Sequence, residues 1–360
     1  MANFTGQLNA NEIFSGLFNM IISQEVFGDN IADTSSDLVD MSSVDGSMYG
    51  DTKLYYATDA LKSAPWGNDA EATNLLALHR PPTPKCQAIE LNVFRQISLT
   101  VDDYLTKRAW ATEGAFSSFN SIMLGWIRDT KRIYKSTTFN AYVGTAQSTV
   151  GAQTQTITLP TDTNAESQAR LQAQTIAKTM AKLLGRLKDV TRDYNDYGFM
   201  RSFRAGDLIA VWNEDAIADI TKMDVPTIFH KDNLIDKLGE YTLPARFFGD
   251  VNSGATEGDG STVRSLIEQD ITKASSPTVH VFAGDLVPKG YTAPEGTSYT
   301  ENAKILFKIM HRRSVPFMSA FEVGTSFFNP KSLTENHYLT WGHNTLEYLK
   351  NYPFITVKSA

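Results

Sequence analysis

The chain contains a single cysteine, Cys86, among 360 residues. One cysteine excludes an internal disulfide and a multi-cysteine zinc site, and it favours synthesis in a cytoplasm. Long apolar runs are also missing, because the longest uncharged, apolar-leaning run near the start, residues 13–24, is too short to span a bilayer. The first basic residue is Lys53, so we expect no secretory leader and no membrane partner.

Basic residues are absent from the first 52 positions, which carry eight acidic residues and therefore a charge of −8. The whole chain has a net charge of −7, so residues 53–360 sum to +1. Phosphate binding requires Lys and Arg, so this segment is not expected to grip nucleic acid. It is either a solvated tail or an arm that lies across a partner subunit. Its apolar side chains favour the arm; they are Phe4, Leu8, Ile13, Phe14, Leu17, Phe18, Ile21 and Ile22.

Patterns that carry chemistry are scarce. The six histidines are scattered, and His337 and His343 have neither helical-face nor same-turn metal spacing. The chain has no Gly-x-Ser-x-Gly string. Residues 254–261 resemble a phosphate loop but lack its Gly-Lys-Ser/Thr ending, so a flexible loop is expected there. We predict no catalytic, cofactor-binding or metal-binding residues and no cofactor.

The most informative stretch is residues 101–142, which contain no proline and place large apolar residues every three or four positions. This spacing is typical of an amphipathic helix, which would span about 60 Å at ~1.5 Å per residue. Gly114 or Gly125 is a candidate break or bend. The predicted stripe consists of Leu105, Ala109, Phe116, Phe119, Met123, Ile127 and Tyr134.

An arm-like segment precedes this helix. Residues 53–56 and 88–94 are predicted strands, and four prolines between them argue against a packed helical region. Two strands joined by a long irregular span form an extended hairpin, whose backbone groups need water, a covering element or another chain.

A second helix is predicted over residues 164–190, with Thr163 and Glu166 at capping-box spacing. Its predicted buried stripe is Leu171, Ile176, Met180, Leu183, Leu184 and Leu187. A buried strand at 207–212 and a short helix at 214–222 follow. Further strands are predicted at 242–248, 278–282, 303–310, 315–323, 337–341 and 354–357. The expected fold class is α+β.

The order of these parts resembles the major capsid proteins of tailed phages of the Hong Kong 97 type. Residues 101–142 look like the spine helix of that family, with Gly144-Thr145-Ala146-Gln147 as its exit. Residues 208–215, LIAVWNED, look like the buried strand and turn of the central domain. Residues 346–357, LEYLKNYPFITV, are similar to the closing peripheral strands.

The resemblance implies a Hong Kong 97-like capsid fold in five parts. These are an N-terminal arm (1–47), an extended β-hairpin loop (48–100), a peripheral domain with the spine helix (101–160), an axial domain (161–300) and a return to the peripheral domain (301–360). It implies a structural, non-enzymatic virion protein that is made in the host cytoplasm and self-assembles into the icosahedral shell of a tailed bacteriophage. The subunit-interface candidates are Phe14, Phe18, Tyr55, Trp66 and Arg80.

The implied partners are copies of the same chain, arranged as hexamers and pentamers, with scaffolding, portal or decoration proteins as further candidates. Packaged DNA is expected to make only weak, non-specific contact, because a mildly acidic wall neutralises few phosphates. Three alternatives stay open at this point: an encapsulin-like compartment shell protein, an enzyme with an unrecognised site in residues 165–300, and another virion or tail component with a binding role.

Overall fold

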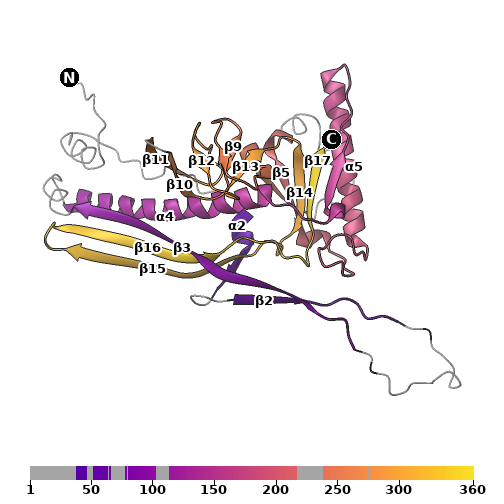
Figure 1. Ribbon diagram of the computed structural model, residues 1–360, viewed down its shortest axis with the longest axis horizontal. Helices are drawn as coiled ribbons and strands as arrows, with labels where there is room; N and C mark the ends of the chain where they lie inside the picture. The colour runs from indigo at the N-terminus through magenta and orange to yellow at the C-terminus, as the bar shows by residue number, and fades with distance from the viewer. Residues whose placement is uncertain are drawn as a thin grey trace.

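In the computed structural model, the described residues are 38–46, 52–63, 65, 78, 80–102, 113–216, 238–273 and 276–360. They form a mixed α and β fold with two long helices, α4 (Glu113–Thr145) and α5 (Ala165–Lys188). Figure 1 shows α4 lying lengthwise along a sheet of long strands, while α5 stands at one end of the molecule. Neither helix is apolar enough over 18 residues to cross a membrane.

The long sheet has the strand order β1-β15-β16-β3-β2. Its strands are β1 (Ser43–Asp45), β2 (Thr52–Ala57), β3 (Lys85–Asp102), β15 (Phe317–Asn329) and β16 (Thr334–Asn344). All pairs are antiparallel except β1 with β15. β3 alternates between a more exposed and a more buried side chain along nearly its whole length, which is the period of two expected of a strand with one covered face. At 18 residues β3 is much longer than a usual strand, because it pairs with β2 over its first third and with β16 over the rest.

A second sheet, with the order β4-β17-β14-β5-β6, forms the centre of the body. Its strands are β4 (Thr154–Ile157), β5 (Leu208–Asn213), β6 (Gly239–Leu243), β14 (Ile305–His311) and β17 (Phe354–Ser359). Every residue of β5 is buried. Leu208, Ala210 and Trp212 pack with α5 on one face, while Ile209 and Val211 pack with the end of α4 on the other. The sheet is thus covered on both sides, which explains its continuous apolar strands.

Between β6 and β14 the chain forms a small β-rich insert, residues 249–301. Its strands are β7 (Gly249–Val251), β8 (Thr256–Glu257), β9 (Val263–Ser265), β10 (Gln269–Lys273), β11 (Ser276–Val281), β12 (Thr292–Ala293) and β13 (Ser298–Glu301). They pair in three small sheets. Short elements complete the chain: α2 (Leu38–Met41) and the 3-10 turns η2 (Gly151–Gln153), η3 (Ala205–Asp207) and η4 (Ala245–Phe247).

The spine helix is real, but its predicted start is wrong. Val101 and Asp102 belong to the end of β3, and the described helix begins at Glu113 and ends at Thr145. Gly125 does not interrupt it. Ile127 and Tyr134 are buried as predicted, whereas Leu105 and Ala109 lie outside the described residues. Sequence periodicity marked the helix but could not separate its start from the preceding strand, because apolar residues occur at both spacings there.

The exit of α4 requires a glycine. A Cβ atom at Gly144 would lie 2.1 Å from the carbonyl oxygen of Phe247, so no other residue lets the last turn of the helix approach η4 so closely. This contact fixes the end of the spine helix against η4, which immediately precedes the β-rich insert.

The second helix also differs in detail from its prediction. Asn164, not Thr163, is the N-cap, and its side chain accepts a hydrogen bond from the backbone N–H of Glu166. Leu171 is exposed, whereas Ile176, Met180, Leu183, Leu184 and Leu187 are buried. Leu171 belongs by spacing to the solvent-facing side, so the predicted stripe was one residue too wide.

The other predicted strands are present in the structure, but several begin or end at different residues than predicted. The strand predicted at 242–248 stops at Leu243, because residues 245–247 form η4. The predicted strand 315–323 extends to Asn329, and 337–341 extends over Thr334–Asn344. Only the first three residues of the predicted helix 214–222 are described, and they are helical. Segment 301–360 supplies strands to both large sheets, since β14 and β17 pair in one sheet and β15 and β16 in the other.

Replacing Leu183 with alanine tests the core between α5 and the central sheet. Leu183 is 2% exposed, so Leu183→Ala should lower the free energy of unfolding by about 2–5 kcal/mol. The matched control is Leu171→Ala on the same helix, where the leucine is 40% exposed and a change below about 1 kcal/mol is expected. Chemical denaturation of the unassembled subunit measures both. Equal losses in the two variants would contradict the assignment of the buried face.

Candidate functional site

The hairpin of β2 and β3 leaves the body of the subunit. In Figure 1 the described residues that continue from these strands extend away from both sheets, well beyond the other elements. Large apolar side chains are exposed along it, including Tyr56 at 68% and Leu78 at 82%, together with Leu54 and Leu61. A projecting hairpin with exposed apolar side chains is a candidate contact surface, since its own chain provides little to cover it.

A second candidate surface is the outer edge of β15. Its first residues pair with β1, which ends at the pair Asp45–Ser319. Beyond Ser319, no described strand pairs with that edge, and Val323, Phe327 and Phe328 are exposed. An open strand edge with apolar side chains is a template for strand addition or for coverage by another segment. We call residues 320–329 the open edge.

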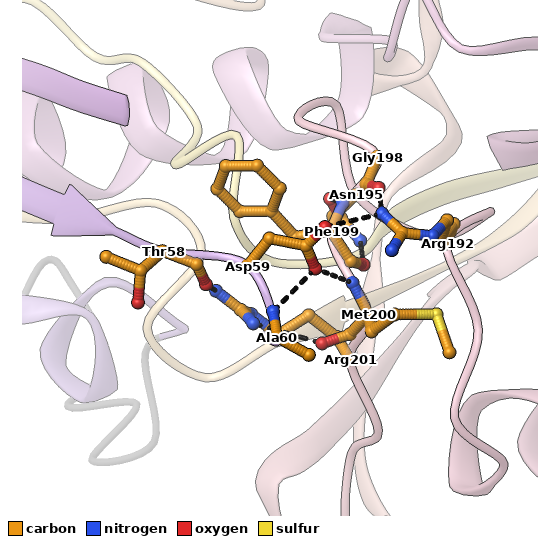
Figure 2. Close-up of polar contacts among 9 residues, drawn as sticks. All are labelled: Thr58, Asp59, Ala60, Arg192, Asn195, Gly198, Phe199, Met200 and Arg201. Atoms are coloured by element: carbon orange, nitrogen blue, oxygen red, sulfur yellow. Dashed lines mark hydrogen bonds and ion pairs between the residues drawn. The ribbon is translucent and has the colours of Figure 1, made fainter. Parts of the chain in front are cut away.

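The base of the hairpin is fixed by a polar clamp, which Figure 2 shows. The Asp59 carboxylate accepts hydrogen bonds from Arg192 Nη1 at 2.7 Å and from the backbone N–H of Met200 at 3.0 Å. Arg201 donates through Nη2 to the carbonyl oxygen of Thr58 at 2.6 Å. The clamp therefore joins the start of the loop to the turn at residues 191–201, which follows α5.

That turn is preorganised to hold the carboxylate. Asn195 bonds both backbone groups of Phe199, donating to its carbonyl at 2.7 Å and accepting from its N–H at 2.9 Å. Gly198 has a φ of +65°, a conformation that favours glycine. Arg192 also donates to the Gly198 carbonyl at 2.7 Å, which aims its guanidinium at Asp59. The hydrogen bond from Met200, followed by that from Arg192, holds the pKa of Asp59 down to about 2.

A second tie holds the opposite strand of the hairpin. Gln87 on β3 donates to the carbonyl of Tyr348 at 3.0 Å and accepts from the backbone N–H of Lys350 at 3.0 Å. The Tyr348 hydroxyl in turn donates to Asp196 at 2.5 Å. The 191–201 turn thus contacts both sides of the hairpin base, directly at Asp59 and through the 348–351 segment at Gln87.

Under the spine helix, a directional chain of hydrogen bonds crosses the long sheet. His343 Nδ1 lies 2.8 Å from the carbonyl of Asn344, so Nδ1 carries the proton and Nε2 accepts from the Tyr134 hydroxyl at 2.6 Å. Arg95 Nε donates to the same hydroxyl at 3.3 Å, and Arg95 Nη2 donates to the Glu268 carbonyl at 2.8 Å. This chain links α4, β3, β16 and the β-rich insert. Burial lowers the pKa of His343 to about 4.

The C-terminal end of α4 meets a buried lysine. Lys308 on β14 is fully buried, and its Nζ donates to the Ala146 carbonyl at 2.6 Å, just past the end of the helix. Burial lowers the pKa of Lys308 well below its usual range. Beside it, Asp250 accepts from Gln147 at 2.6 Å, Asn302 at 2.5 Å and Lys358 at 3.1 Å. These bonds position α4 and are structural in nature.

The sequence-predicted interface residues are only partly placed. Phe14, Phe18 and Trp66 lie outside the described residues. Arg80 is exposed. Tyr55 is half-buried and packs against the cluster of Ile89, Leu91 and Leu349, and burial raises its pKa. The structure does not bring Tyr55 and Arg80 together in any hydrogen bond or ring contact among the described residues.

The sequence analysis did not predict the clamp of Asp59 and Arg192, nor the exposed side chains of the hairpin such as Tyr56. Asp59 and Arg192 are 133 positions apart, so no local pattern joins them. Tyr56 could have been found, because strand alternation places neighbours on opposite faces. No group of three or more His, Cys, Asp or Glu side chains in the described part of the chain could hold a metal ion.

Comparisons with known proteins identify the family and the fold. The sequence model of the family described as Phi29-like phage major capsid protein matches residues 2–356. No curated protein sequence matches the chain. The fold is similar to a chain in the capsid structure of Staphylococcus phage Andhra, at 9% identity and a TM-score of 0.60. It is also similar to a chain in the structure of the head fiber and inner core protein gp22 of native bacteriophage P68, at 10% identity and a TM-score of 0.61. Each match covers 94% of this chain and 88% of the other.

Removing the carboxylate of the clamp should loosen the hairpin base. In Asp59→Ala, amide hydrogen exchange at residues 58–60 and 199–201 should accelerate about tenfold or more, because Met200 and Arg192 lose their acceptor. Since the folded pKa of Asp59 lies below its ordinary value, the clamp is complete at neutral pH and is lost only as the pH falls toward 2.

The control for the clamp is Asp193→Ala, which removes an exposed carboxylate from the same turn. This variant should leave exchange at residues 58–60 unchanged. Equal acceleration in the two variants would show that charge in the turn, and not the specific hydrogen bonds of Asp59, holds the hairpin.

Stability should depend on pH through His343. Its folded pKa of about 4 lies below the ordinary value of 6.5, so the folded state binds fewer protons than the unfolded chain between these values. The contribution of His343 to the free energy of unfolding should therefore be greatest above pH 6.5 and decrease as the pH falls toward 4. The total decrease should be on the order of 3 kcal/mol, at ~1.4 kcal/mol per pKa unit. Denaturant unfolding at pH 7, 6 and 5 measures the slope.

His311 contributes to the same slope, because burial also lowers its pKa to about 4. The His343→Gln variant should therefore have a shallower pH dependence, and His343→Gln with His311→Gln a nearly flat one over this range. A slope that persists unchanged in the double variant would contradict both assignments.

Proposed function

This chain belongs to the Phi29-like phage major capsid protein family, and on that premise we propose that its copies form the hexamers and pentamers of a closed icosahedral shell around the phage genome. The protein is a phage major capsid protein, its location is the virion capsid, and it assembles with copies of itself. The fold agrees with that of tailed-phage capsid chains over most of its length. The comparisons do not support an encapsulin-like compartment or an enzyme.

The observation that carries the proposal is the projecting hairpin. A subunit that holds exposed Leu54, Tyr56, Leu61 and Leu78 away from its body gains by burying them on a neighbour. The clamp of Asp59 and Arg192 supports this reading, because it sets the direction in which the hairpin leaves the body. A contact between the hairpin of one copy and a different surface of the next is heterologous, and such contacts close into rings.

The open edge supports a second contact of the same kind. Val323, Phe327 and Phe328 are exposed residues of β15, and Figure 1 shows β15 and β16 extending beneath α4 toward the end of the molecule opposite α5. Permanent assemblies bury over about 2,000 Å² in total, and we propose that both surfaces contribute to that area. Phe14, Phe18, Trp66 and Arg80 remain our proposed interface residues beside them, and Tyr55 is proposed to support the hairpin from its inner face.

The domain division is also a proposal. Residues 1–47 serve as the arm, 48–100 as the extended loop, 101–160 and 301–360 as the peripheral domain, and 161–300 as the axial domain. β14 pairs with β5 on one side and with β17 on the other, so the final segment also completes the central sheet. Synthesis in the host cytoplasm, a role without catalysis, and scaffolding, portal or decoration partners belong to the same proposal.

Neighbouring tyrosines on β2 separate assembly from folding. Tyr56 is 68% exposed and Tyr55 is half-buried against the subunit's own core. Tyr56→Ser should lower the yield of shells, seen by electron microscopy and sedimentation, while the unfolding free energy of the subunit stays within about 0.5 kcal/mol. Tyr55→Ser should instead destabilise the subunit by about 1–3 kcal/mol.

Undiminished shell yield in Tyr56→Ser would argue against the hairpin as a contact surface. Loss of subunit stability in Tyr56→Ser, to the same extent as in Tyr55→Ser, would show that both tyrosines serve the fold.

A further inference from the structure

The outer face of α5 concentrates positive charge in a chain whose net charge is negative. Every charged residue between Glu166 and Asp189 is basic, although the whole chain has a net charge of −7. All five are exposed. They are Arg170, Lys178, Lys182, Arg186 and Lys188, and we call them the α5 basic row.

The basic row lies opposite the buried stripe of the helix. At ~100° per residue, Lys178 and Lys182 are about 160° around the helix from Met180, which is fully buried. Lys178, Lys182 and Arg186 follow one another at i, i+4 spacing, so their Cβ atoms are about 6 Å apart. From Arg170 to Lys188 the row extends about 27 Å at ~1.5 Å per residue. Figure 1 shows α5 at one end of the molecule, with the central sheet on one side only.

These charges are not neutralised within the subunit. No hydrogen bond or ion pair joins any of the five side chains to another residue in the part of the chain that the structure describes. Like charges at i, i+4 repel each other and destabilise a helix. A row of this kind is stabilised when an external polyanion supplies the counter-charge.

The chemistry of the row fits a nucleic-acid backbone better than a protein surface. Lysine is depleted at protein–protein interfaces, which are centred on aromatic and apolar side chains. After its first turn, the exposed residues of α5 are instead the five basic residues, Gln174, Gly185 and Leu171, and Leu171 is the only large apolar one among those described. Basic residues aligned along one helix face are typical of contact with phosphates, of which duplex DNA presents one charge per about 1.7 Å of axis.

We propose that the α5 basic row faces the inside of the shell and contacts the phosphates of the packaged duplex DNA without reading its base sequence. This inference rests on the proposed function, since it requires a shell that encloses DNA. Because each acidic chain offers only five such side chains, the affinity of one subunit for DNA is weak. The contributions of the many copies in a shell add together.

The first experiment measures the salt dependence of DNA binding by full-length, unassembled subunits. The probes are two 30-base-pair duplexes of unrelated sequence. The variant is Lys178→Gln with Lys182→Gln and Arg186→Gln. The plot of log K against log salt should become shallower by about 2–3 in this variant, at ~0.9 per lost phosphate contact, and the two duplexes should bind equally.

The matched control removes the same charge elsewhere. Lys289, Lys304 and Lys331 are exposed and lie outside α5. Their triple glutamine variant should leave the salt slope within about 0.5 of the unmodified protein. Equal loss in both triple variants would overturn the proposal, because DNA binding would then reflect total charge only.

A second measurement locates the row in filled particles. Formaldehyde crosslinking followed by mass spectrometry should recover DNA-linked peptides that contain Lys178 or Lys182. A bulky, water-soluble lysine reagent added outside intact particles should label these two lysines at least tenfold more slowly than in free subunits. Rapid labelling from outside, or DNA crosslinks confined to other segments, would overturn the proposal.

Two further outcomes are distinct from these. If the α5 triple variant loses shell assembly while its DNA binding is unchanged, the row contacts acidic residues of a neighbouring copy, and the proposal is wrong. The β-rich insert, with eight acidic and three basic residues over 249–301, is the natural surface for that outcome. If the unmodified protein forms no shells at all, the proposed function fails, independently of the salt slope.

Discussion

A β-hairpin that extends beyond the body of its own subunit cannot bury both of its faces, and the structure depends on this constraint. β3 is 18 residues long, and its more buried side chains alternate with more exposed ones along nearly its whole length. Near the base, Ile89 and Leu91 pack on the subunit, while Leu54 and Tyr56 on β2 point to solvent. Within the described part of the chain this apolar surface is exposed, and its burial on a second molecule would be favourable. The folded subunit therefore exposes apolar surface that assembly with other copies would bury.

The rest of the subunit fixes the direction in which the hairpin of β2 and β3 projects. The central sheet is covered by α5 on one face and by the end of α4 on the other, so its apolar side chains are packed on both sides. The turn after α5 then clamps Asp59, and the 348–351 segment holds Gln87. Tyr134 and His343 tie the spine helix to the long sheet. Each contact joins segments distant in the sequence, so the orientation of the hairpin is a property of the whole fold and not of the loop.

Several elements could be predicted from their residues because the signal was local. The apolar stripe of α5 identified Met180, Leu183 and Leu187 as core, and the unbroken run of residues 208–212 identified a strand buried on both faces. The resemblance to tailed-phage capsid proteins came from the order of such elements, and the family match confirmed it. Errors occurred where the local signal was shared by two structures. Val101 fits both a helical stripe and an alternating strand. Leu171 is apolar, but its position lies about 180° around the helix from Met180, and it is exposed.

The sequence by itself determined the α+β class, the long helix, the projecting hairpin and the segregation of charge between the leading 52 residues and α5. These follow from periodicity and composition, which each segment carries alone. Only the tertiary structure decided which carboxylate meets which guanidinium, which of two adjacent tyrosines faces inward, and which edge of β15 stays open. Those outcomes depend on the pairing of residues more than a hundred positions apart, and the free energy of such a pairing is set by the geometry of the packed chain and not by the residues near either partner.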